Sequence, residues 1–168
     1  MPHKNAAGDV YPLNHLHPFR FPLELERGPV TISVAFAMHC FTRGIQSEDT
    51  SGDMYQDARE KRTFCPERYQ LSRLLPRLVR DLASASCRFA KSGNYVTVEA
   101  VDLNGNRRVY GVFFNVRQWK HEGGPRILLT VQSAYALSPT QHQPGTGKIR
   151  FTRLIELTLE GVKPKPPR

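Results

Sequence analysis

A hydroxyl and a phenol lie two residues apart near the end of the apolar segment Arg126 to Leu137. The side chains of a β-strand point alternately to its two faces. The pattern therefore predicts one shared face with six members: Ile127, Leu129, Val131, Ser133, Tyr135 and Leu137. The aliphatic residues would anchor this face in a core, and Ser133 and Tyr135 would follow where their hydroxyls can donate to a phosphate. A purely structural role, as the rim of a core strand, is the other interpretation of the pair.

The charge of the chain favours an anionic partner for such a pair. The 168 residues include 24 Lys and Arg against 15 Asp and Glu, which gives a formal net charge of +9. A positive field of this size concentrates polyanions near the protein and speeds their encounter, and nucleic acid is the commonest such partner. Incidental basicity of a small protein is the alternative interpretation.

Four basic residues lie just before and within the first turn of a predicted helix that begins at Pro66. They are Arg59, Lys61, Arg62 and Arg68. Because the N-terminus of a helix itself favours anions, this group is a candidate for binding phosphate or nucleic acid. A solvated, charged helix entry is the ordinary alternative.

His39 is the candidate for proton transfer. The alternation of apolar and small polar residues predicts a strand from Val30 to Phe41, with His39 near its end on the small, polar face. The pKa of a histidine lies near neutrality, so the side chain can act as a general base or acid. A partly buried histidine that bonds only to the backbone is an equally open interpretation.

Together these residues fit metal-independent cleavage of RNA. The reaction needs a base for the ribose 2′-hydroxyl, cations for the crowded phosphate, and an acid for the leaving 5′-oxygen. His39 would move the proton, the arginines would bind the phosphate with their forked donors, and Ser133 and Tyr135 would donate to the same oxygens. We expect no cofactor, since the chain has no Walker loop and no dinucleotide-binding fingerprint.

No metal site is predicted either. His15, His17, Cys40 and Cys65 do not have the spacing of a structural zinc site. The three cysteines form no C-x-x-C pair, which favours free thiols in a reducing cytoplasm. No segment has the length and apolarity of a membrane span, and the N-terminus lacks the apolar region of a secretion signal.

The chain alternates between strand and helix patterns that predict its elements. Leucines and a valine at helical spacing predict a helix from Pro66 to Ala83, and Pro76 predicts a kink or a break into two helices. We expect residues 43–63 to form a mobile loop with one helical turn near 55–61. The expected strands are Phe19–Leu25, Val30–Phe41, Tyr95–Leu103, Arg108–Val116, Arg126–Leu137 and Lys148–Leu159.

These elements predict an α+β fold: a twisted antiparallel β-meander, one kinked helix or helix pair packed on one face, and an N-terminal β-hairpin. The dipeptide Asn104–Gly105 predicts the hairpin turn between two meander strands. We expect a single domain over residues 1–162, which includes an irregular arm over 1–18, and a disordered basic tail over 163–168. A flexible connection is expected from Ser138 to Gly147.

Three segments and the hairpin turn resemble small RNase toxins of the barnase/EndoU/colicin/RelE-like group. The segments are Arg62-Thr-Phe-Cys-Pro-Glu-Arg-Tyr, Leu74-Leu-Pro-Arg-Leu-Val and Leu129-Thr-Val-Gln-Ser-Ala-Tyr. The resemblance covers residues 60–137 and implies a helix followed by a curved four-stranded meander. It also implies that Ser133 and Tyr135 are the catalytic pair of the last core strand, with His39 as the histidine and Arg62 or Arg68 as the cation.

Three functions follow from these observations. The first is an RNA-cleaving toxin or phage-defence effector, with RNA as substrate and an antitoxin or immunity protein as a partner. The second is a non-catalytic basic module of a mobile element that binds nucleic acid or protein. The third is a structural protein whose charge is incidental.

Overall fold

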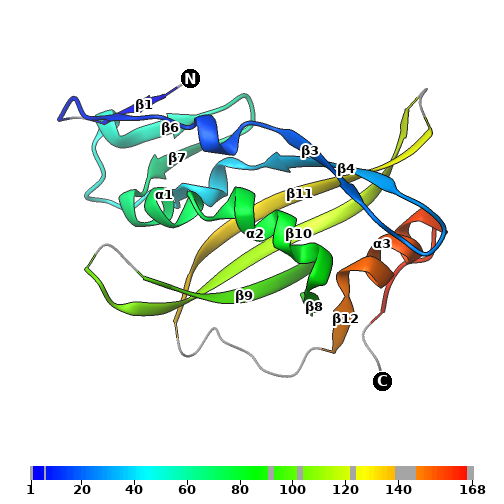
Figure 1. Ribbon diagram of the computed structural model, residues 1–168. Helices are drawn as coiled ribbons and strands as arrows, with labels where there is room; N and C mark the ends of the chain where they lie inside the picture. Colours follow the sequence, from blue (N-terminus) through cyan, green and yellow to red (C-terminus); the bar gives the residue numbers. More distant parts are fainter. Residues whose placement is uncertain are drawn as a thin grey trace.

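A twisted seven-stranded sheet is the centre of the computed structural model, which describes residues 2–5, 7–90, 93–101, 104–121, 124–138 and 147–165 (Figure 1). The order of its strands is β12-β8-β9-β10-β11-β4-β3. Helices cover one face of this sheet. A single cluster of buried apolar side chains lies between the sheet and the helices.

Four consecutive strands of the sheet form an antiparallel meander; three of them match predicted strands, and the first, β8, was not predicted. They are β8 (Ser86–Ala90), β9 (Gly93–Val101), β10 (Arg107–His121) and β11 (Gly124–Leu137). Gly105 lies between β9 and β10 with φ of +79°, a conformation that glycine adopts without steric cost. The predicted α+β class and the Asn-Gly turn are therefore confirmed.

The N-terminal hairpin extends the sheet on the far side of β11. Its strands are β3 (Phe19–Leu23) and β4 (Val30–Phe36), which pair antiparallel with each other. β4 also pairs with β11, and this pairing is parallel. The predicted strand Val30–Phe41 is too long, because the chain leaves the sheet after Phe36 and turns into the 3-10 helix η2 (Met38–Cys40).

Two short helices meet near Pro76, as predicted. They are α1 (Pro66–Ser72) and α2 (Leu75–Asp81), and α2 runs on into the 3-10 helix η4 (Leu82–Ser84). Each proline lies in the first turn of its helix, where the missing N–H has no cost. The predicted apolar stripe packs against the sheet through Leu71, Leu75, Val79 and Leu82.

The predicted last strand, Lys148–Leu159, is wrong. Only β12 (Lys148–Arg150) is a strand, and it pairs with β8; the chain then forms helix α3 (Phe151–Leu159). Phe151, Leu154 and Ile155 are all buried, and their spacing of three and four residues is helical rather than alternating. They pack into the same core as the helix pair.

Two regions that we expected to be irregular contain regular structure. Within 1–18 the structure has β1 (His3–Lys4), β2 (Val10–Tyr11) and the 3-10 helix η1 (Asn14–Leu16). Within 43–63 and its flanks it has β5 (Thr42–Arg43), the 3-10 helix η3 (Ser51–Asp53), β6 (Met54–Gln56) and β7 (Lys61–Phe64). Strands β5, β7 and β6 form a small separate sheet, so the expected helical turn at 55–61 is wrong.

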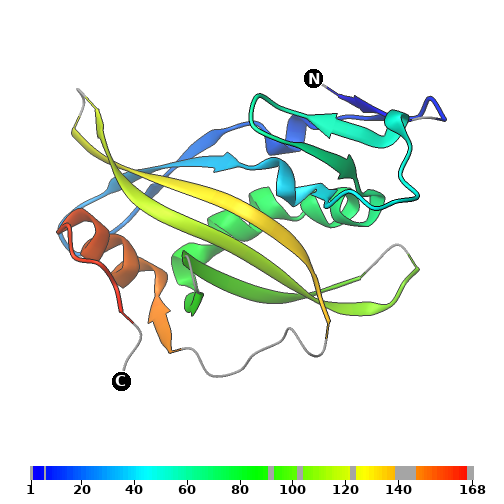
Figure 2. The ribbon, with the colours of Figure 1, turned by 180° about the vertical axis from the view of Figure 1, so that it is seen from behind.

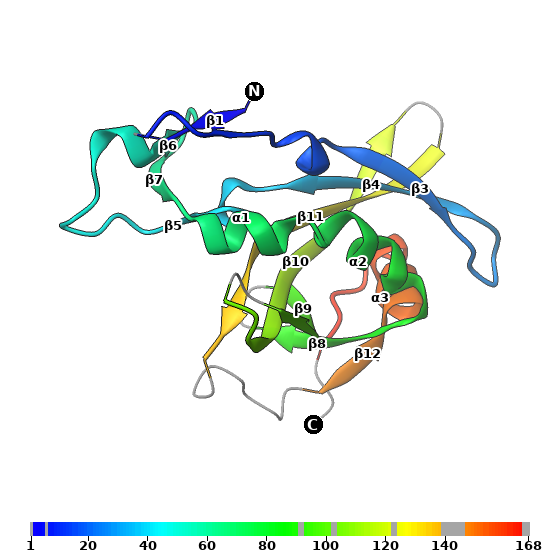
Figure 3. The same cartoon turned by 60° about the vertical axis from the view of Figure 1, so that its left-hand side comes forward.

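Side-chain bonds explain why so polar a segment folds. Asp49 accepts from Arg43, from Thr63 and from the backbone of Gln46, and Asp57 caps the turn that joins β6 to β7. Figure 3 shows this small sheet and β1 at one end of the helix pair, with α3 near the other end beside α2.

Some expectations fall outside the described residues: most of the connection between β11 and β12 (139–146), and the end of the basic tail (166–168). Among the described helices, none combines the length and apolarity that crossing a bilayer requires.

Candidate functional site

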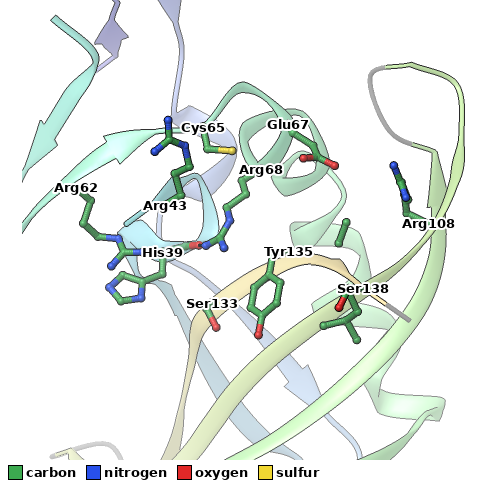
Figure 4. A pocket seen from close by; sticks show the side chains of 12 residues that line it. His39, Arg43, Arg62, Cys65, Glu67, Arg68, Arg108, Ser133, Tyr135 and Ser138 are labelled. Carbon is green, nitrogen blue, oxygen red and sulfur yellow. Dashed lines mark hydrogen bonds between the residues drawn. The ribbon is translucent and has the colours of Figure 1, made fainter. Parts of the chain in front are cut away.

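A cavity of about 650 Å³ opens beside the C-terminal half of β11, past the point where β4 ends. Its walls come from η2, β5, β7, α1, β10 and β11. The lining residues are His39, Arg43, Arg62, Cys65, Glu67, Arg68, Arg108, Ser133, Tyr135, Ala136, Leu137 and Ser138. In Figure 4, His39, Arg62 and Arg68 lie on one side of Ser133 and Tyr135, and Arg108 lies on the other.

A β-bulge in β11 decides which way Ser133 and Tyr135 point. The partner of Phe113 is Ser133, but the partner of Phe114 is Val131, so Gln132 is an extra residue in the ladder. The predicted shared face is therefore wrong: Ser133 and Tyr135 lie on the opposite face of the sheet from Ile127, Leu129 and Val131. An extra residue in a strand re-aims the side chains that follow it, and here it turns the pair out of the core and into the cavity.

Tyr135 is held between a ring and a cation. Its ring stacks on Phe113 with centroids 5.3 Å apart. The guanidinium carbon of Arg68 lies 4.8 Å from the centre of the Tyr135 ring, within the range of a cation–π contact. Both Tyr135 and Ser133 are half-buried, so the pair forms part of the cavity wall and is not sealed in the core.

His39 lies in η2 rather than in a strand, so its predicted position at a strand end is wrong, although the residue does line the cavity. Its Nε2 bonds to Oε1 of Glu60 at 2.5 Å. A carboxylate on one imidazole nitrogen fixes the tautomer and orients the ring. With the Nε2 proton donated to Glu60, Nδ1 is the nitrogen that can accept a proton.

Arg68 fastens α1 to the loop that carries His39. Its Nη1 donates to the backbone oxygens of His39 at 3.2 Å and of Thr42 at 2.8 Å. Burial of the guanidinium lowers the pKa of Arg68, although the group stays charged because its ordinary pKa is so high. Arg68 therefore positions the histidine loop and brings a desolvated positive charge to the cavity.

Arg62 and Arg43 complete the positive side of the cavity, and both guanidinium groups donate to hydroxyl or carboxylate oxygens of neighbouring side chains. Arg62 donates from Nε to the Thr42 hydroxyl at 3.0 Å, and its Nη1 lies 3.5 Å from Glu60. Arg43 binds both oxygens of Asp49, at 2.8 and 2.5 Å. The donations from Arg43 and then Thr63 lower the pKa of the Asp49 carboxyl, which stays ionised beside the arginine.

The two remaining predicted cations do not belong to the cavity. Arg59 is exposed in the turn between β6 and β7, and Lys61 is exposed at the start of β7. Neither lines the cavity, so of the predicted cation group only Arg62 and Arg68 do. Side chains of a strand alternate, which sends Lys61 away from the face that Arg62 shares.

Sequence reasoning missed several lining residues, above all Arg43, Arg108 and Glu67, as well as Glu60, the partner of His39. Arg43 and Arg108 come from strands that meet only through tertiary folding, and no local pattern marks them. Arginine makes up four of the cavity's ionised side chains and glutamate one, so the lining as a whole attracts anions.

The thiols near the cavity differ in their surroundings. Cys40 is fully buried, donates weakly to the Val131 oxygen, and has a pKa raised to about 12 by burial. Cys65 is half-buried and lines the cavity. Within the described part of the chain, no group of three or more His, Cys, Asp or Glu side chains is arranged to hold a metal ion.

Comparison with known proteins gives a family. The YjaZ family matches residues 3–159, which includes every residue of the cavity. Protein YjaZ of Escherichia coli (strain K12) is 30% identical over 139 residues, which are 80% of this chain and 74% of that protein. No solved structure matches the chain. The extent of the family match shows that the chain belongs to the YjaZ family.

Proposed function

We propose that this protein binds RNA in the cavity described above and cleaves its backbone without a metal ion. One observation carries the proposal: His39, Arg62, Arg68, Ser133 and Tyr135 come from four separate elements and line a single cavity. A base, cations and hydroxyl donors are the groups that transfer of a phosphoryl group to a neighbouring 2′-hydroxyl requires.

The arrangement suggests a role for each side chain. Nδ1 of His39, with Glu60 holding the ring from the other side, takes the proton of the ribose 2′-hydroxyl. The 2′-oxygen attacks the adjacent phosphorus, and the bond from phosphorus to the 5′-oxygen breaks. The Tyr135 phenol gives its proton to that leaving oxygen. The products are a 2′,3′-cyclic phosphate and a free 5′-hydroxyl.

The cations act on the charge that develops at phosphorus. Arg62 lies beside His39 at the cavity wall and is 18% exposed, so a bound phosphate would displace little water from it (Figure 4). Arg68 adds a charge whose position is fixed by two backbone carbonyls. Donors that are placed in advance stabilise a transition state more than donors that must reorganise.

The biological setting is also part of the proposal. An enzyme of this kind would act in the cytoplasm, where its three free cysteines stay reduced, as a toxin or phage-defence effector. An antitoxin or immunity protein would then cover the cavity. Growth arrest on expression, relieved by loss of His39, is the result that this setting predicts.

A second function has its own observation in support. Glu60 and Asp49 hold His39, Arg62 and Arg43 in ion pairs, and such a network can stabilise a loop without taking part in chemistry. On this alternative the protein binds nucleic acid or a partner protein and cleaves nothing.

A cleavage assay separates the two functions. Labelled single-stranded RNA is incubated with purified protein in excess chelator, and the products are tested for a 2′,3′-cyclic phosphate. We expect His39→Ala to lower the rate by about 10²- to 10⁴-fold, the usual contribution of a general base, and Tyr135→Phe to lower it as well. A 2′-deoxy substitution at the cleaved position should stop the reaction.

The matched control is His17→Ala, which removes an exposed histidine outside the cavity and should leave the rate unchanged. Salt-dependent RNA binding with no cyclic phosphate in any preparation would reject cleavage in favour of the binding function. Absence of both binding and cleavage would reject the RNA proposal altogether.

A further inference from the structure

We propose that the uncovered face of the sheet is a track for single-stranded RNA that leads into the cavity, a proposal that rests on the function proposed above. This face is the one opposite the helices. Figure 2 shows β10 and β11 in front of α1 and α2, with no helix over the strands on this side. The core residues of both strands point the other way.

The ladder fixes which side chains share the uncovered face. Across four neighbouring strands, one row of partners is Arg20, Ser33, Leu128 and Arg117. The next row on the same face is Pro22, Thr31, Arg126 and Trp119. These two rows place three arginines around one tryptophan, which is 39% exposed.

A second hollow lies within these rows. It has a volume of about 550 Å³ and is lined by Pro18, Phe19, Arg20, Ser33, Val34, Ala35, Trp119 and Leu128. Ser33 is only 6% exposed, and its hydroxyl has no hydrogen-bond partner among the described residues. A buried hydroxyl without a partner is costly, so a ligand that bonds to it would gain that energy.

The charge of these strands points to a polyanion as the ligand. The sequences of β3, β4, β10 and β11 contain no aspartate and no glutamate. On the uncovered face they contain Arg20, Arg107, Arg117 and Arg126. Basic strands that also carry an exposed aromatic side chain match the pattern by which sheets bind single-stranded nucleic acid.

Leu128, which lines the hollow, and Ser133, which lines the cavity, lie on the same face of β11. The partners of Leu128 and Ser133 in β10, Arg117 and Phe113, are four residues apart, roughly 13 Å at a rise of ~3.3 Å per residue. The bulge at Gln132 puts them on one face; without an extra residue, positions of opposite parity would point to opposite faces. An extended strand of RNA with its cleaved phosphate in the cavity can therefore place a later nucleotide in the hollow.

Each group in the hollow then has a role. The indole of Trp119 stacks on a base, which favours single-stranded RNA because a paired base hides its face. The Ser33 hydroxyl bonds to a polar group of the same nucleotide. Arg20, Arg117 and Arg126 neutralise the phosphates on either side.

Binding of non-cleavable RNA of two lengths tests the track. We would measure dissociation constants for 2′-O-methyl dinucleotides and octanucleotides with wild type, Trp119→Ala and Trp119→Phe. The expected result is a loss of about ten-fold in octanucleotide affinity for Trp119→Ala, with dinucleotide affinity unchanged. Trp119→Phe should retain most of the affinity, because it keeps a stacking ring.

A matched pair of variants tests whether the arginines of this face bind the RNA phosphates. Arg20→Gln should lower the salt dependence of octanucleotide binding by about 0.7 in the slope of log K against log salt. Arg77→Gln removes the same charge from the exposed side of α2 and should change nothing. Equal affinities of Trp119→Ala and wild type for the octanucleotide would overturn the track, as would a dimer in solution that Trp119→Ala dissociates.

The two proposals fail in different ways. If the dinucleotide binds and longer RNA is cleaved, but Trp119→Ala has no effect at any length, only the track is wrong. If neither length binds to wild type, the RNA function fails along with it.

Discussion

Arg68 shows how one side chain can organise a site as well as bring charge to it. Its guanidinium bonds to two backbone carbonyls of the loop that holds His39, and it lies over the ring of Tyr135. Lysine could not replace it, because an ammonium group has neither the planar fork nor the stacking face. The proposed base and the proposed acid therefore both depend on this one residue for their positions.

We predict that Arg68→Gln destabilises the protein by about 2 kcal/mol, because it removes charged hydrogen bonds and leaves two carbonyls poorly satisfied. RNA cleavage should fall in addition, and Arg68→Lys should not restore it. Urea denaturation followed by circular dichroism measures the first effect, and the cleavage assay measures the second. Arg77→Gln, whose arginine is 89% exposed, is the control. Full activity in Arg68→Lys would contradict the positioning role.

At the scale of the element, the bulge in β11 connects the fold to the site. Val131 is the last residue of β11 that pairs with β4, and its carbonyl accepts from the backbone N–H of Ala37 just before η2. The extra residue, Gln132, follows at once. The strand therefore bends where the loop of His39 begins, and Ser133 and Tyr135 face that loop.

Deletion of Gln132 tests the importance of this bend. Val131, Ser133 and Ala134 would then alternate without interruption, so the core face is preserved and stability should change by no more than about 1 kcal/mol. The strand loses its bend, however, and the hydroxyl pair moves away from His39. A displacement of about 1 Å can cost 10²-fold in rate. We therefore expect a folded protein whose cleavage is at least ten-fold slower, measured with the same labelled RNA.

Gln132→Ala keeps the extra residue but removes the side chain, and it should behave as wild type in both measurements. If the deletion variant cleaves RNA at the normal rate, the bulge is an irregularity of the strand with no role in the site.

Most elements of the fold, but not the details of the site, were predictable from local patterns. The helix pair around Pro76, the Asn-Gly turn and the meander follow from periodicity and turn chemistry, which act over a few residues. The parallel pairing of β4 with β11 has no local signal. The bulge at Gln132 has no local signal either. It places Ser133 and Tyr135 on the opposite face from the one predicted, although both residues line the cavity.

The remaining errors have the same origin. The sheet of β5, β6 and β7 is polar in sequence and is held by side-chain bonds to Asp49, which a hydrophobic pattern cannot indicate. Glu60 lies twenty-one residues from His39 and meets it only because β7 returns beside β5. Helix α3 was mistaken for a strand because a short apolar run fits both periods.

At the scale of the whole molecule, strands β1 and β2 at the N-terminus pack against the small sheet of β5, β6 and β7, which forms part of the cavity wall. The ring of His3 stacks on Phe64 of β7 at 4.3 Å, and Tyr11 and Tyr55 lie around the same pair. His3 is only 5% exposed, and its Nε2 has no hydrogen-bond partner among the described residues. Burial lowers the pKa of His3 below its ordinary 6.5, and the negative charge of Asp53 opposes this only in part.

The burial of His3 in this contact predicts that the protein loses stability in mild acid. Because the pKa of His3 is lower in the folded chain than in the unfolded chain, the unfolded state binds more protons, and stability falls as the pH drops below about 6.5. His15, whose pKa is also lowered by burial, adds to the same slope. Asp49 does not contribute to this slope, because its carboxyl pKa is lowered and its protonation reduces stability only below about pH 4.

Urea denaturation at pH 7.5 and pH 5 should therefore show a lower midpoint at pH 5. His3→Phe, which fits the aromatic cluster and cannot be protonated, should reduce the difference, and His17→Gln on the surface should not. An unchanged difference in His3→Phe would mean that strands β1 and β2 detach in solution before His3 is protonated.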